Sequence, residues 1–377
     1  MINVLHVVSL MNRGGQETFI MNVYRNIDHS KINFKFLCSD SRHADYDEEI
    51  KELGGDIFYL DQPLYTHGIR KGIEKIKVLK SWFGRNKKTF DIVHLHTYHA
   101  YDALILLISC RIAGVKNIIV HSHNTSGPHP HLHSICRFLC GFFKHYKFAC
   151  GREAGKWMFG PYITTPSFRV INNGIKTSDF KYNESLRNKY RRDLNIEDKF
   201  VVGHIGRFHP QKNHELLIDA FYKFHEYKND SVLLLIGDGD TKSLIKRKIK
   251  QYGIEDAVLF LGIRNDVPQL LNSFDLFLFP SLHEGLSVCA IEVQCNGLKI
   301  LTSDIPSMRE ANITGTVCFE SLLSPSEVWA NHILSIDNFK HARDSHLVVK
   351  QNGYDILDVA SNLQSIYEKI FLGYDSI

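Results

Sequence analysis

The eight cysteines of this 377-residue chain form no C-x-x-C pair and show no regular spacing. Disulfide frameworks and structural zinc sites usually carry paired cysteines, so this pattern predicts reduced thiols, as in a cytosolic protein. The stretch MINVLHVVSL at the N-terminus lacks a basic flank and a small-residue cleavage site, which argues against a signal peptide. The apolar stretch 103–110 is too short to span a bilayer. We therefore expect a cytoplasmic protein.

The composition lacks the features of a disordered or fibrous chain. Hydrophobic residues make up 44% of the sequence and charged residues 23%, as in an ordinary soluble globular enzyme. A chain of 377 residues exceeds the size at which a single hydrophobic core usually keeps growing. Two domains are therefore expected.

Strand-like and helix-like segments alternate along the chain, and this pattern occurs twice. NVLHVVSL, DIVHLHT and NIIVHSHN are strand-like segments of the first half, and FVVGHIGRF, SVLLLIGDG and DLFLFP belong to the second half. The alternation predicts two doubly wound α/β domains of the Rossmann type. We place them at 1–175 and 200–350, joined by a polar linker at 176–199. The last segment, 351–377, holds a helix that is free to pack back on the first domain.

Positive charge is concentrated in the first half of the chain. Lys and Arg minus Asp and Glu give 22 − 14 = +8 for residues 1–175 and 23 − 27 = −4 for the remainder. The segment 69–88 mixes cations with apolar residues, and as a helix it has an apolar stripe beside a basic face. Such a helix either lies on an anionic membrane, here the inner face of the cell membrane, or packs its stripe into the core. The aromatic segment 133–146 lines an acceptor groove or belongs to the core. No nucleic-acid partner is expected, and the oligomeric state is open.

The stretch LFLFPSLHEGLSVCAIE, residues 276–292, combines a buried strand with two glutamates. Pro280 ends the strand, Ser281 is a candidate cap, and SVCAIEVQC begins a helix whose free N–H groups suit a phosphate. Glu284 and Glu292 are pure acceptors when ionised, and sugar hydroxyls are donors. The pattern thus indicates hydroxyl recognition at both ends of a phosphate-containing ligand. The alternative is a capping residue and a solvated helix glutamate.

The first strand-to-helix turn of each predicted domain also suits phosphate. Gly14 and Gly15 permit a tight turn close to a ligand. In GRFHPQKNHE, Arg207 follows a strand and Lys212 lies near a helix start, which suits a diphosphate; the alternative is two surface cations. The sequence GDGD, residues 237–240, resembles a metal-binding D-x-D motif, but we favour a Gly-rich turn.

Histidine is frequent, with 21 residues, 13 of them before Lys176. Imidazole is the commonest metal ligand, so a metal cluster is one interpretation. Several of these histidines alternate along predicted strands, however, and would then face opposite sides of a sheet. We therefore expect no metal site. The histidines concerned are His94, His96, His99, His121, His123, His129, His131 and His133.

Six elements share their order and spacing with a known family: the GGQE loop, HSHN, INNGI, GRFHPQKNH, LLLIGDG and EGLSVCAIE. Over nearly the whole chain they resemble the retaining glycosyltransferases of family 4 (glycosyl transferases group 1), which include enzymes of capsule and exopolysaccharide synthesis. The resemblance implies the GT-B fold, in which two Rossmann-like domains face each other across a cleft. The first would bind the acceptor and the second the nucleotide sugar.

The resemblance also implies roles for residues at the matching positions. The donor diphosphate would contact Arg207 and Lys212, the transferred sugar would contact Glu284, and the ribose hydroxyls would contact Glu292. Phosphate contacts would also come from the backbone N–H groups of Gly285, Leu286 and Ser287. Gly14 and Gly15 would let the loop of the first domain close over the donor, and His123 would stand beside the reacting sugar. The implied catalytic set is His123, Glu284, Arg207 and Lys212. The acceptor side matches loosely, which leaves His121, Asn124 and Glu17 without a role.

The implied activity is a hexosyltransferase-type transfer (EC 2.4) with retention, from a nucleotide-diphosphate sugar, expected to be a UDP-sugar, to a lipid-linked or other glycan acceptor. No metal or cofactor is expected, because Arg207, Lys212 and a helix dipole would stabilise the leaving diphosphate. No carboxylate is assigned as nucleophile. The alternatives are a nucleotide-sugar epimerase on the same fold and a non-catalytic sugar-nucleotide binding protein. A Rossmann dehydrogenase is disfavoured, since no G-x-G-x-x-G follows either first strand.

Overall fold

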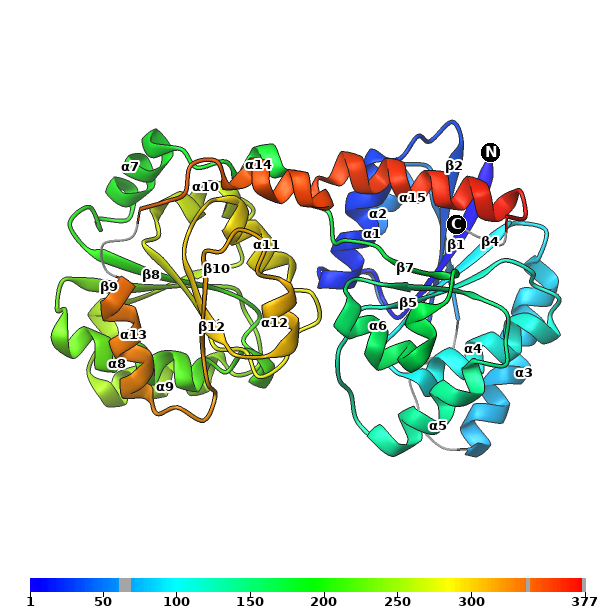
Figure 1. Ribbon diagram of the computed structural model, residues 1–377, viewed down its shortest axis with the longest axis horizontal. Helices are drawn as coiled ribbons and strands as arrows, with labels where there is room; N and C mark the ends of the chain where they lie inside the picture. The colour runs from blue at the N-terminus through cyan, green and yellow to red at the C-terminus, as the bar shows by residue number, and fades with distance from the viewer. Residues whose placement is uncertain (61–68, 337–339, 375–377) are drawn as a thin grey trace. The chain divides into compact units, whose positions relative to one another are not determined.

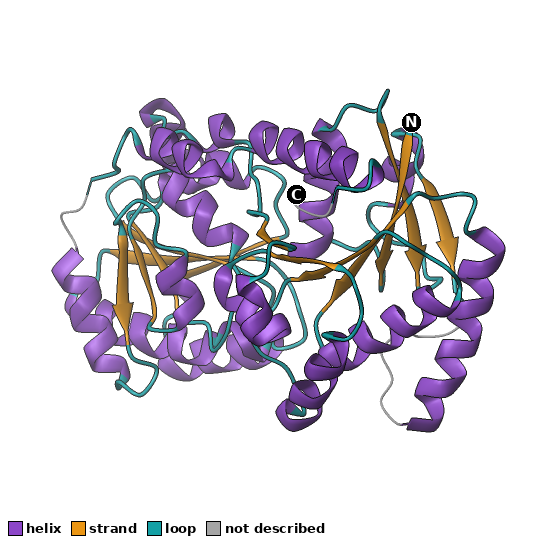
Figure 2. Cartoon of the chain, turned by 45° about the vertical axis from the view of Figure 1, so that its right-hand side comes forward, coloured by secondary structure: helices purple, strands orange, loops and turns teal. Residues whose placement is uncertain are grey.

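The computed structural model describes residues 1–60, 69–336 and 340–374. The chain forms two compact units. The first unit comprises Met1–Gly174 with Ile356–Ile377, and the second comprises Ile175–Asp355 (Figure 1). In both units helices lie on the two faces of a parallel sheet, and Figure 2 separates the helices from the strands by colour.

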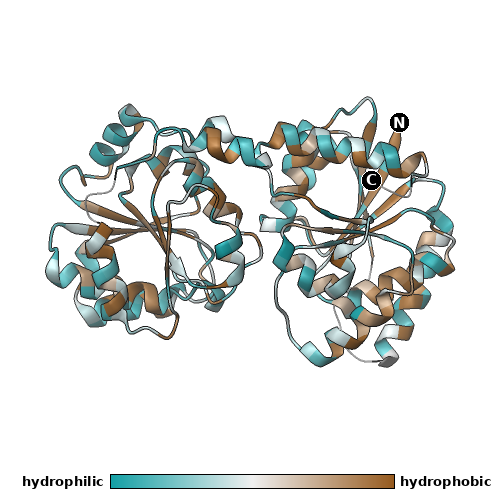
Figure 3. Ribbon diagram, viewed as in Figure 1, coloured by the Kyte–Doolittle hydropathy of each residue, from teal (hydrophilic) through white to brown (hydrophobic). Residues whose placement is uncertain are grey.

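The first unit contains a seven-stranded parallel sheet with the strand order β3-β2-β1-β4-β5-β6-β7. β4 and β5 are buried along their whole length, as in a parallel sheet covered on both faces, although each carries histidine; the strands of both sheets are largely brown in Figure 3. The strands are β1 (Ile2–Val8), β2 (Ile32–Cys38), β3 (Asp56–Tyr59), β4 (Ile92–Thr97), β5 (Ile118–Ser122), β6 (Tyr146–Ala149) and β7 (Phe168–Val170). The helices are α1 (Gly15–Asn26), α2 (Asp47–Glu52), α3 (Ile69–Asn86), α4 (Ala100–Ile112), α5 (Pro130–Cys140), α6 (Arg152–Phe159) and α15 (Ile356–Phe371).

The second unit contains a six-stranded sheet with the order β10-β9-β8-β11-β12-β13. Its strands are β8 (Phe200–Ile205), β9 (Ser231–Ile236), β10 (Val258–Gly262), β11 (Leu276–Phe279), β12 (Ile300–Ser303) and β13 (Val317–Glu320). Its helices are α7 (Glu184–Asp193), α8 (His214–Tyr227), α9 (Lys242–Tyr252), α10 (Val267–Leu270), α11 (Val288–Cys295), α12 (Pro306–Glu310), α13 (Ser326–Ile336) and α14 (Ser345–Val349). In both sheets the strand order reverses beside the first strand, as in a doubly wound fold.

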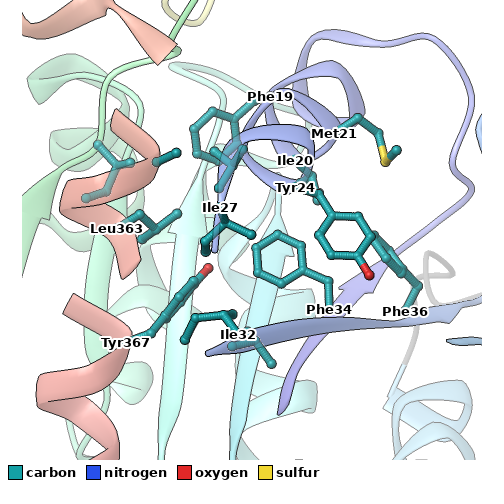
Figure 4. Close-up of a cluster of buried hydrophobic side chains, with 14 of the residues drawn as sticks. Phe19, Ile20, Met21, Tyr24, Ile27, Ile32, Phe34, Phe36, Leu363 and Tyr367 are labelled. Carbon is teal, nitrogen blue, oxygen red and sulfur yellow. The ribbon is translucent and has the colours of Figure 1, made fainter. Parts of the chain in front are cut away.

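The last helix, α15, completes the core of the first unit, where it contacts α1, β1 and β4. In Figure 4 its residues Leu363 and Tyr367 lie in the same apolar cluster as Phe19 and Phe34. The buried face follows the helical repeat. It consists of Ile356, Val359, Ala360, Leu363, Ile366, Tyr367 and Ile370.

The expected linker at 176–199 differs from the structure, because this segment folds within the second unit as a 3-10 turn (Thr177–Phe180) and α7. Two of its charged residues form ion pairs within the second unit. Arg187 and Arg191 both pair with Asp275, the residue before β11, and Arg191 Nη1 lies 3.0 Å from Asp275 Oδ2. Residues 351–355 also belong to the second unit. The sequence prediction missed β13, a strand of four residues at the sheet edge.

The segment 69–88, for which a membrane surface and the core were alternatives, forms α3. Its apolar residues Leu79, Trp82 and Phe83 are buried, and the Trp82 ring contacts the rings of Phe58 and Phe90. The apolar stripe of α3 therefore packs into the core of the first unit. Among the described helices, none has both the length and the apolar character that crossing a bilayer requires.

Candidate functional site

In the second unit the candidate residues follow the carboxyl ends of β8 and β11, which are neighbours in the sheet. This is the point where the strand order reverses, and open α/β sheets bind ligands there. The loop after β8 is tied to the loop after β11, because the Leu282 N–H donates to the Gln211 carbonyl at 2.8 Å and Gln211 Nε2 donates to the His283 carbonyl at 2.8 Å. Two loops distant in sequence thus form one surface.

The strongest polar contact on this surface joins Lys212 and Glu284. Lys212 Nζ lies 2.7 Å from Glu284 Oε1, and the side chains are only 18% and 8% exposed. The ammonium group also lies 4.7 Å from the centre of the Phe279 ring. The turn Pro210–Lys212 and the left-handed Asn213 (φ 53°) place Lys212 directly before α8. The structure thus brings together two of the predicted site residues.

The helix that the sequence predicts after β11 is present, and its N-terminus has the free N–H groups that suit a phosphate. α11 begins at Val288, and its cap is Ser287, whose hydroxyl accepts from the Ala290 N–H at 3.3 Å. Ser281 is therefore not the cap; it is buried before the helix. The first turn directs free N–H groups toward the preceding loop, which contains Gly285 and Leu286.

Glu292 lies one turn into α11, where burial raises its pKa to about 7. Cys289 on the same helix has a strongly raised pKa, because it is buried and because Glu292 and Glu284 act on it, with Lys212 opposing them. Glu292, Glu284 and Lys212 therefore all lie near the Cys289 thiol. Glu292 thus shares the environment of the Lys212–Glu284 pair.

Arg207 stands apart from that pair. Its side chain is exposed, and Nη2 lies 3.5 Å from Asp240 Oδ2. The GDGD sequence forms a glycine-rich turn: Asp238 Oδ1 accepts from the Gly239 N–H at 2.8 Å, and its other oxygen lies 3.3 Å from Lys242 Nζ. Both aspartates thus have cationic neighbours from the chain itself.

In the first unit, Gly14 and Gly15 begin α1 as predicted. A Cβ on Gly14 would lie 2.4 Å from Glu17 Oε2, so the glycine leaves room for that carboxylate to fold against the loop. Gln16 Nε2 donates to Glu17 Oε1 at 3.2 Å, and burial raises the pKa of Glu17 to about 7. Burial raises the pKa of Tyr98, and the Glu17 carboxylate raises it further, so the two side chains are neighbours.

Histidines form two hydrogen-bonded rows: the first runs from β1 through β4 to the residue after β5, and the second runs from α15 through β4 to β5. In the first row, His6 Nδ1 lies 2.9 Å from His96 Nε2, and His96 Nδ1 lies 2.9 Å from His123 Nε2. In the second row, the Tyr367 hydroxyl lies 2.8 Å from His94 Nδ1, and His94 Nε2 lies 3.1 Å from His121 Nδ1. The expectation of opposite faces was wrong for these side chains. Residues two apart in a strand share a face, and neighbouring strands align them.

The described residues contain two groups of histidines compact enough for a metal ion: His6 with His94 and His96, and His96 with His121 and His123. Mutual hydrogen bonding already accounts for this proximity. Burial lowers the pKa of His6 and of His123 to about 3, so both rings are neutral near pH 7. His6 was not singled out from the sequence. The signal was available as histidines at matching positions of adjacent strands.

The hydrogen bonds of the first row all run in the same donor-to-acceptor direction. A neutral imidazole has one N–H. In the part of the chain that the structure describes, His6 Nε2 is buried without a hydrogen-bond partner. Because buried N–H groups are rarely left without an acceptor, the proton of His6 belongs on Nδ1. Each ring then donates to the next from Nδ1, and His123 is left with an N–H on its outer nitrogen.

Comparisons with known proteins agree with this arrangement. Residues 187–354 match the family model described as glycosyl transferases group 1. A Bacillus subtilis (strain 168) protein named as the glycosyltransferase EpsF is 32% identical over 97% of this chain and 96% of its own length.

Two further relatives are each 24% identical. The capsular polysaccharide biosynthesis glycosyltransferase CapH of Staphylococcus aureus aligns over 97% of this chain and 99% of the length of CapH. The UDP-Gal:alpha-D-GlcNAc-diphosphoundecaprenol alpha-1,3-galactosyltransferase of Escherichia coli aligns over 81% and 80%.

Solved structures show the same fold at lower sequence identity. The crystal structure of Anabaena Alr3699/HepE in complex with UDP-glucose superposes with a TM-score of 0.79 at 19% identity, covering 98% of this chain and 100% of that one. With its two parallel sheets, the chain has the GT-B fold. The chain therefore belongs to the glycosyl transferases group 1 family, and it is a glycosyltransferase.

Proposed function

We propose that this glycosyltransferase moves a sugar from a UDP-sugar to a lipid-linked saccharide, with retention at the anomeric carbon and without a metal ion. The polymer concerned would be a capsular or extracellular polysaccharide. The names of two relatives support this acceptor and this product. The acceptor of the galactosyltransferase is a diphosphoundecaprenol saccharide, and CapH belongs to capsular polysaccharide biosynthesis. The Anabaena protein binds UDP-glucose.

The observation that carries the proposal is the Lys212–Glu284 pair beside the first turn of α11. In the free protein the two charges compensate each other at 2.7 Å. A nucleotide sugar offers each a better partner, since its diphosphate is anionic and its sugar hydroxyls donate hydrogen bonds. Lys212 then binds the diphosphate and Glu284 binds the transferred sugar.

Departure of the diphosphate is the step that needs electrostatic help. Negative charge grows on the leaving phosphate as the glycosidic bond breaks, and Lys212 together with the free N–H groups of α11 stabilises it. Arg207, exposed on the same loop as Lys212, supplies a second cation when it leaves Asp240. Gly285, Leu286 and Ser287 bring the backbone to the phosphate, and Glu292 accepts the ribose hydroxyls.

In the first unit, we assign His123 to the reacting sugar. Its outer N–H makes it a hydrogen-bond donor, suited to a hydroxyl oxygen, and its low pKa excludes a role as a cationic acid near pH 7. Gly14 and Gly15 keep the α1 loop open to the donor. Glu17, with a pKa of about 7, lies in the first turn of that helix.

A transfer assay tests the proposal. The purified chain is incubated with UDP-sugars and an undecaprenyl-diphosphate-linked N-acetylglucosamine acceptor, with and without EDTA. We expect UDP release and a glycosylated lipid, equal in both conditions, with the anomeric configuration of the donor by NMR. An inverted product would contradict retention, and loss of activity in EDTA that a divalent metal restores would contradict metal independence.

The same assay separates the epimerase alternative. Donor incubated alone should remain unchanged, because the proposed reaction needs an acceptor. Interconversion of the UDP-sugar without acceptor would identify an epimerase. Tight binding of the UDP-sugar without turnover under any of these conditions would identify a binding protein.

A further inference from the structure

The outward face of α5 is apolar. Ile135, Phe138, Leu139 and Phe142 are exposed by 60%, 60%, 40% and 73%, and their spacing of three, four and seven residues puts them on one side of the helix and its final turn. The rings of Phe138 and Phe142 contact each other edge to face, with centroids 5.2 Å apart. Soluble proteins rarely expose large side chains in such a contiguous patch without a partner.

The inward face of α5 is occupied by smaller or polar residues. Cys136 and Cys140 are buried, and His133 accepts from the Ala100 N–H at 3.2 Å while its other nitrogen lies 2.9 Å from the Trp157 carbonyl. These contacts fix the orientation of the helix. The larger apolar side chains therefore point outward because the packing of α5 holds them there.

A basic pocket adjoins the C-terminal end of this face. It has a volume of about 940 Å³, and its wall includes Phe142 and Phe143 together with Tyr162. None of the described residues that line it is acidic. Its cations are Arg111, Lys116, Lys144 and Lys147.

One of these cations is nearly enclosed. Lys147 is buried, and its ammonium group donates to two neutral partners: the Ser167 hydroxyl at 3.1 Å and the His145 carbonyl at 3.4 Å. Burial lowers its pKa, so an anion in the pocket would favour its charged form. The pocket is thus suited to phosphate.

The pocket is separate from the sugar-transfer residues of the first unit. Its wall includes Asn117 and Ile118 at the amino end of β5 and Tyr146 and Lys147 at that of β6. His123 follows the opposite, carboxyl end of β5. A strand of this length, about 16 Å, therefore separates the pocket from His123.

The geometry points to a docking surface for an anionic phospholipid bilayer, formed by the outward face of α5 and the basic pocket beside it. The aromatic and aliphatic side chains enter the level of the headgroups, and the pocket takes a lipid phosphate. Charge complementarity favours this occupant over a second copy of the chain, because the pocket is basic and presents no carboxylate to match it. The inference extends the proposed function, in which the acceptor is lipid-linked, but its test needs neither donor nor acceptor.

Vesicle sedimentation with the purified full chain tests the inference. We expect binding to vesicles of phosphatidylglycerol and phosphatidylcholine in equal parts, weakened by salt, and far less binding to phosphatidylcholine alone. Phe138→Ser with Phe142→Ser should lower the partition coefficient about tenfold or more, and Lys116→Glu with Lys144→Glu should do the same. These four side chains lie at the surface, so thermal melting should remain near that of the parent chain.

The matched control is Lys77→Glu with Lys80→Glu on α3, an equal change of charge on a basic helix of the first unit, where both residues are exposed. It should change binding far less. The inference is wrong if the chain does not bind anionic vesicles, if it binds neutral vesicles as well, or if the α3 variant loses binding while the two docking-surface variants keep it. A change of oligomeric state in Phe138→Ser with Phe142→Ser, without lipid binding by the parent chain, would instead identify a contact between copies.

Discussion

At the scale of single residues, the Lys212–Glu284 contact is the feature from which the chemistry can be tested most directly. A charged pair with so little exposure is costly to keep unless the charges meet a ligand or each other. The sequence placed both residues in loops after strands. It could not show their contact, because 72 positions separate them and the contact depends on how β8 and β11 pair.

Lys212→Ala and Glu284→Ala should each lower kcat/KM at least about a hundredfold, because we propose that Lys212 stabilises the leaving diphosphate and that Glu284 holds the sugar. Initial rates of UDP release with acceptor measure this effect. Lys248→Ala is the control, since Lys248 pairs with Asp219 at the same 2.7 Å and with a similar exposure of 20%, but neither residue belongs to the candidate site. If both site variants turned over like this control, the site assignment would be wrong.

Glu292 should make donor binding depend on pH. Burial raises its pKa from an ordinary 4.5 to about 7, so the carboxyl is protonated at pH 6 and ionised at pH 8. Protonation turns one carboxyl oxygen into a donor, whereas the ionised form accepts with both oxygens, as the proposed binding of two ribose hydroxyls requires. The Kd for UDP-glucose should therefore fall by about tenfold as the pH rises from 6 to 8. Calorimetry measures this change, and the diphosphate diester of UDP-glucose does not itself titrate in this range.

Glu292→Gln supplies the control, because an amide does not titrate and should bind with a flat pH profile. The stability of the fold should depend on pH in the opposite sense to donor binding. A carboxyl whose pKa is raised on folding stabilises the folded state below its unfolded pKa, and this contribution is lost as the pH rises through about 7. A pH profile for Glu292→Gln as steep as that of the parent chain would assign the dependence to another group.

At the scale of elements, the three strands β1, β4 and β5 together set the chemistry of His123. His6 lies in β1, His96 lies in β4 and His123 follows β5, and the parallel pairing of these strands brings the rings to hydrogen-bonding distance. If His123 acts on the reacting sugar as we propose, His6 and His96 are positioning residues, since they act through His123.

His6→Phe should therefore change His123 without unfolding the unit, because His6 already packs against the rings of Phe34 and Phe36. His96 Nε2 then loses its hydrogen-bond donor, so nothing fixes the tautomer of His96 or, through it, that of His123. We expect kcat to fall by about tenfold with the donor KM unchanged. The ¹⁵N shifts of His123 should report a mixture of its two tautomers, and His6→Asn, whose amide can still donate, should restore much of the rate.

The sequence was informative wherever a pattern repeats locally. Apolar runs predicted most of the strands of both sheets, and Pro280 ended β11 as expected. It was misleading where distant partners decide. The charges of 176–199 suggested a linker, yet two of its arginines pair with Asp275. Ser281 and Ser287 are equivalent caps by composition, and only the path of the loop selects Ser287.

At the scale of the whole molecule, the chain passes from the first unit to the second after Gly174 and returns at Ile356. The second unit is therefore continuous in sequence, and the first is not. Helix α15 contributes seven buried residues to the core of the first unit. Burying a large apolar side chain stabilises by about 1.5–3 kcal/mol, so their sum is comparable to the whole stability of an ordinary domain, about 5–15 kcal/mol.

Two fragments should therefore behave differently. Residues 175–355 should fold alone and melt cooperatively in circular dichroism, because their sheet and core are complete. Residues 1–174 should lack a cooperative transition, because the α15 face of their core is exposed. Adding a peptide of residues 356–374 in excess should restore it. A cooperative melt of 1–174 without the peptide would show that α15 is dispensable.

The discontinuous first unit also has a consequence during synthesis. The ribosome makes residues 1–174 first, but their core waits for α15 until the 181 residues of 175–355 have followed. At common elongation rates this delay lasts roughly 10–40 s. The half made second can thus mature before the half made first. A message cut short before codon 356 would yield a folded second unit attached to an incomplete first unit, a product that proteases can recognise and remove.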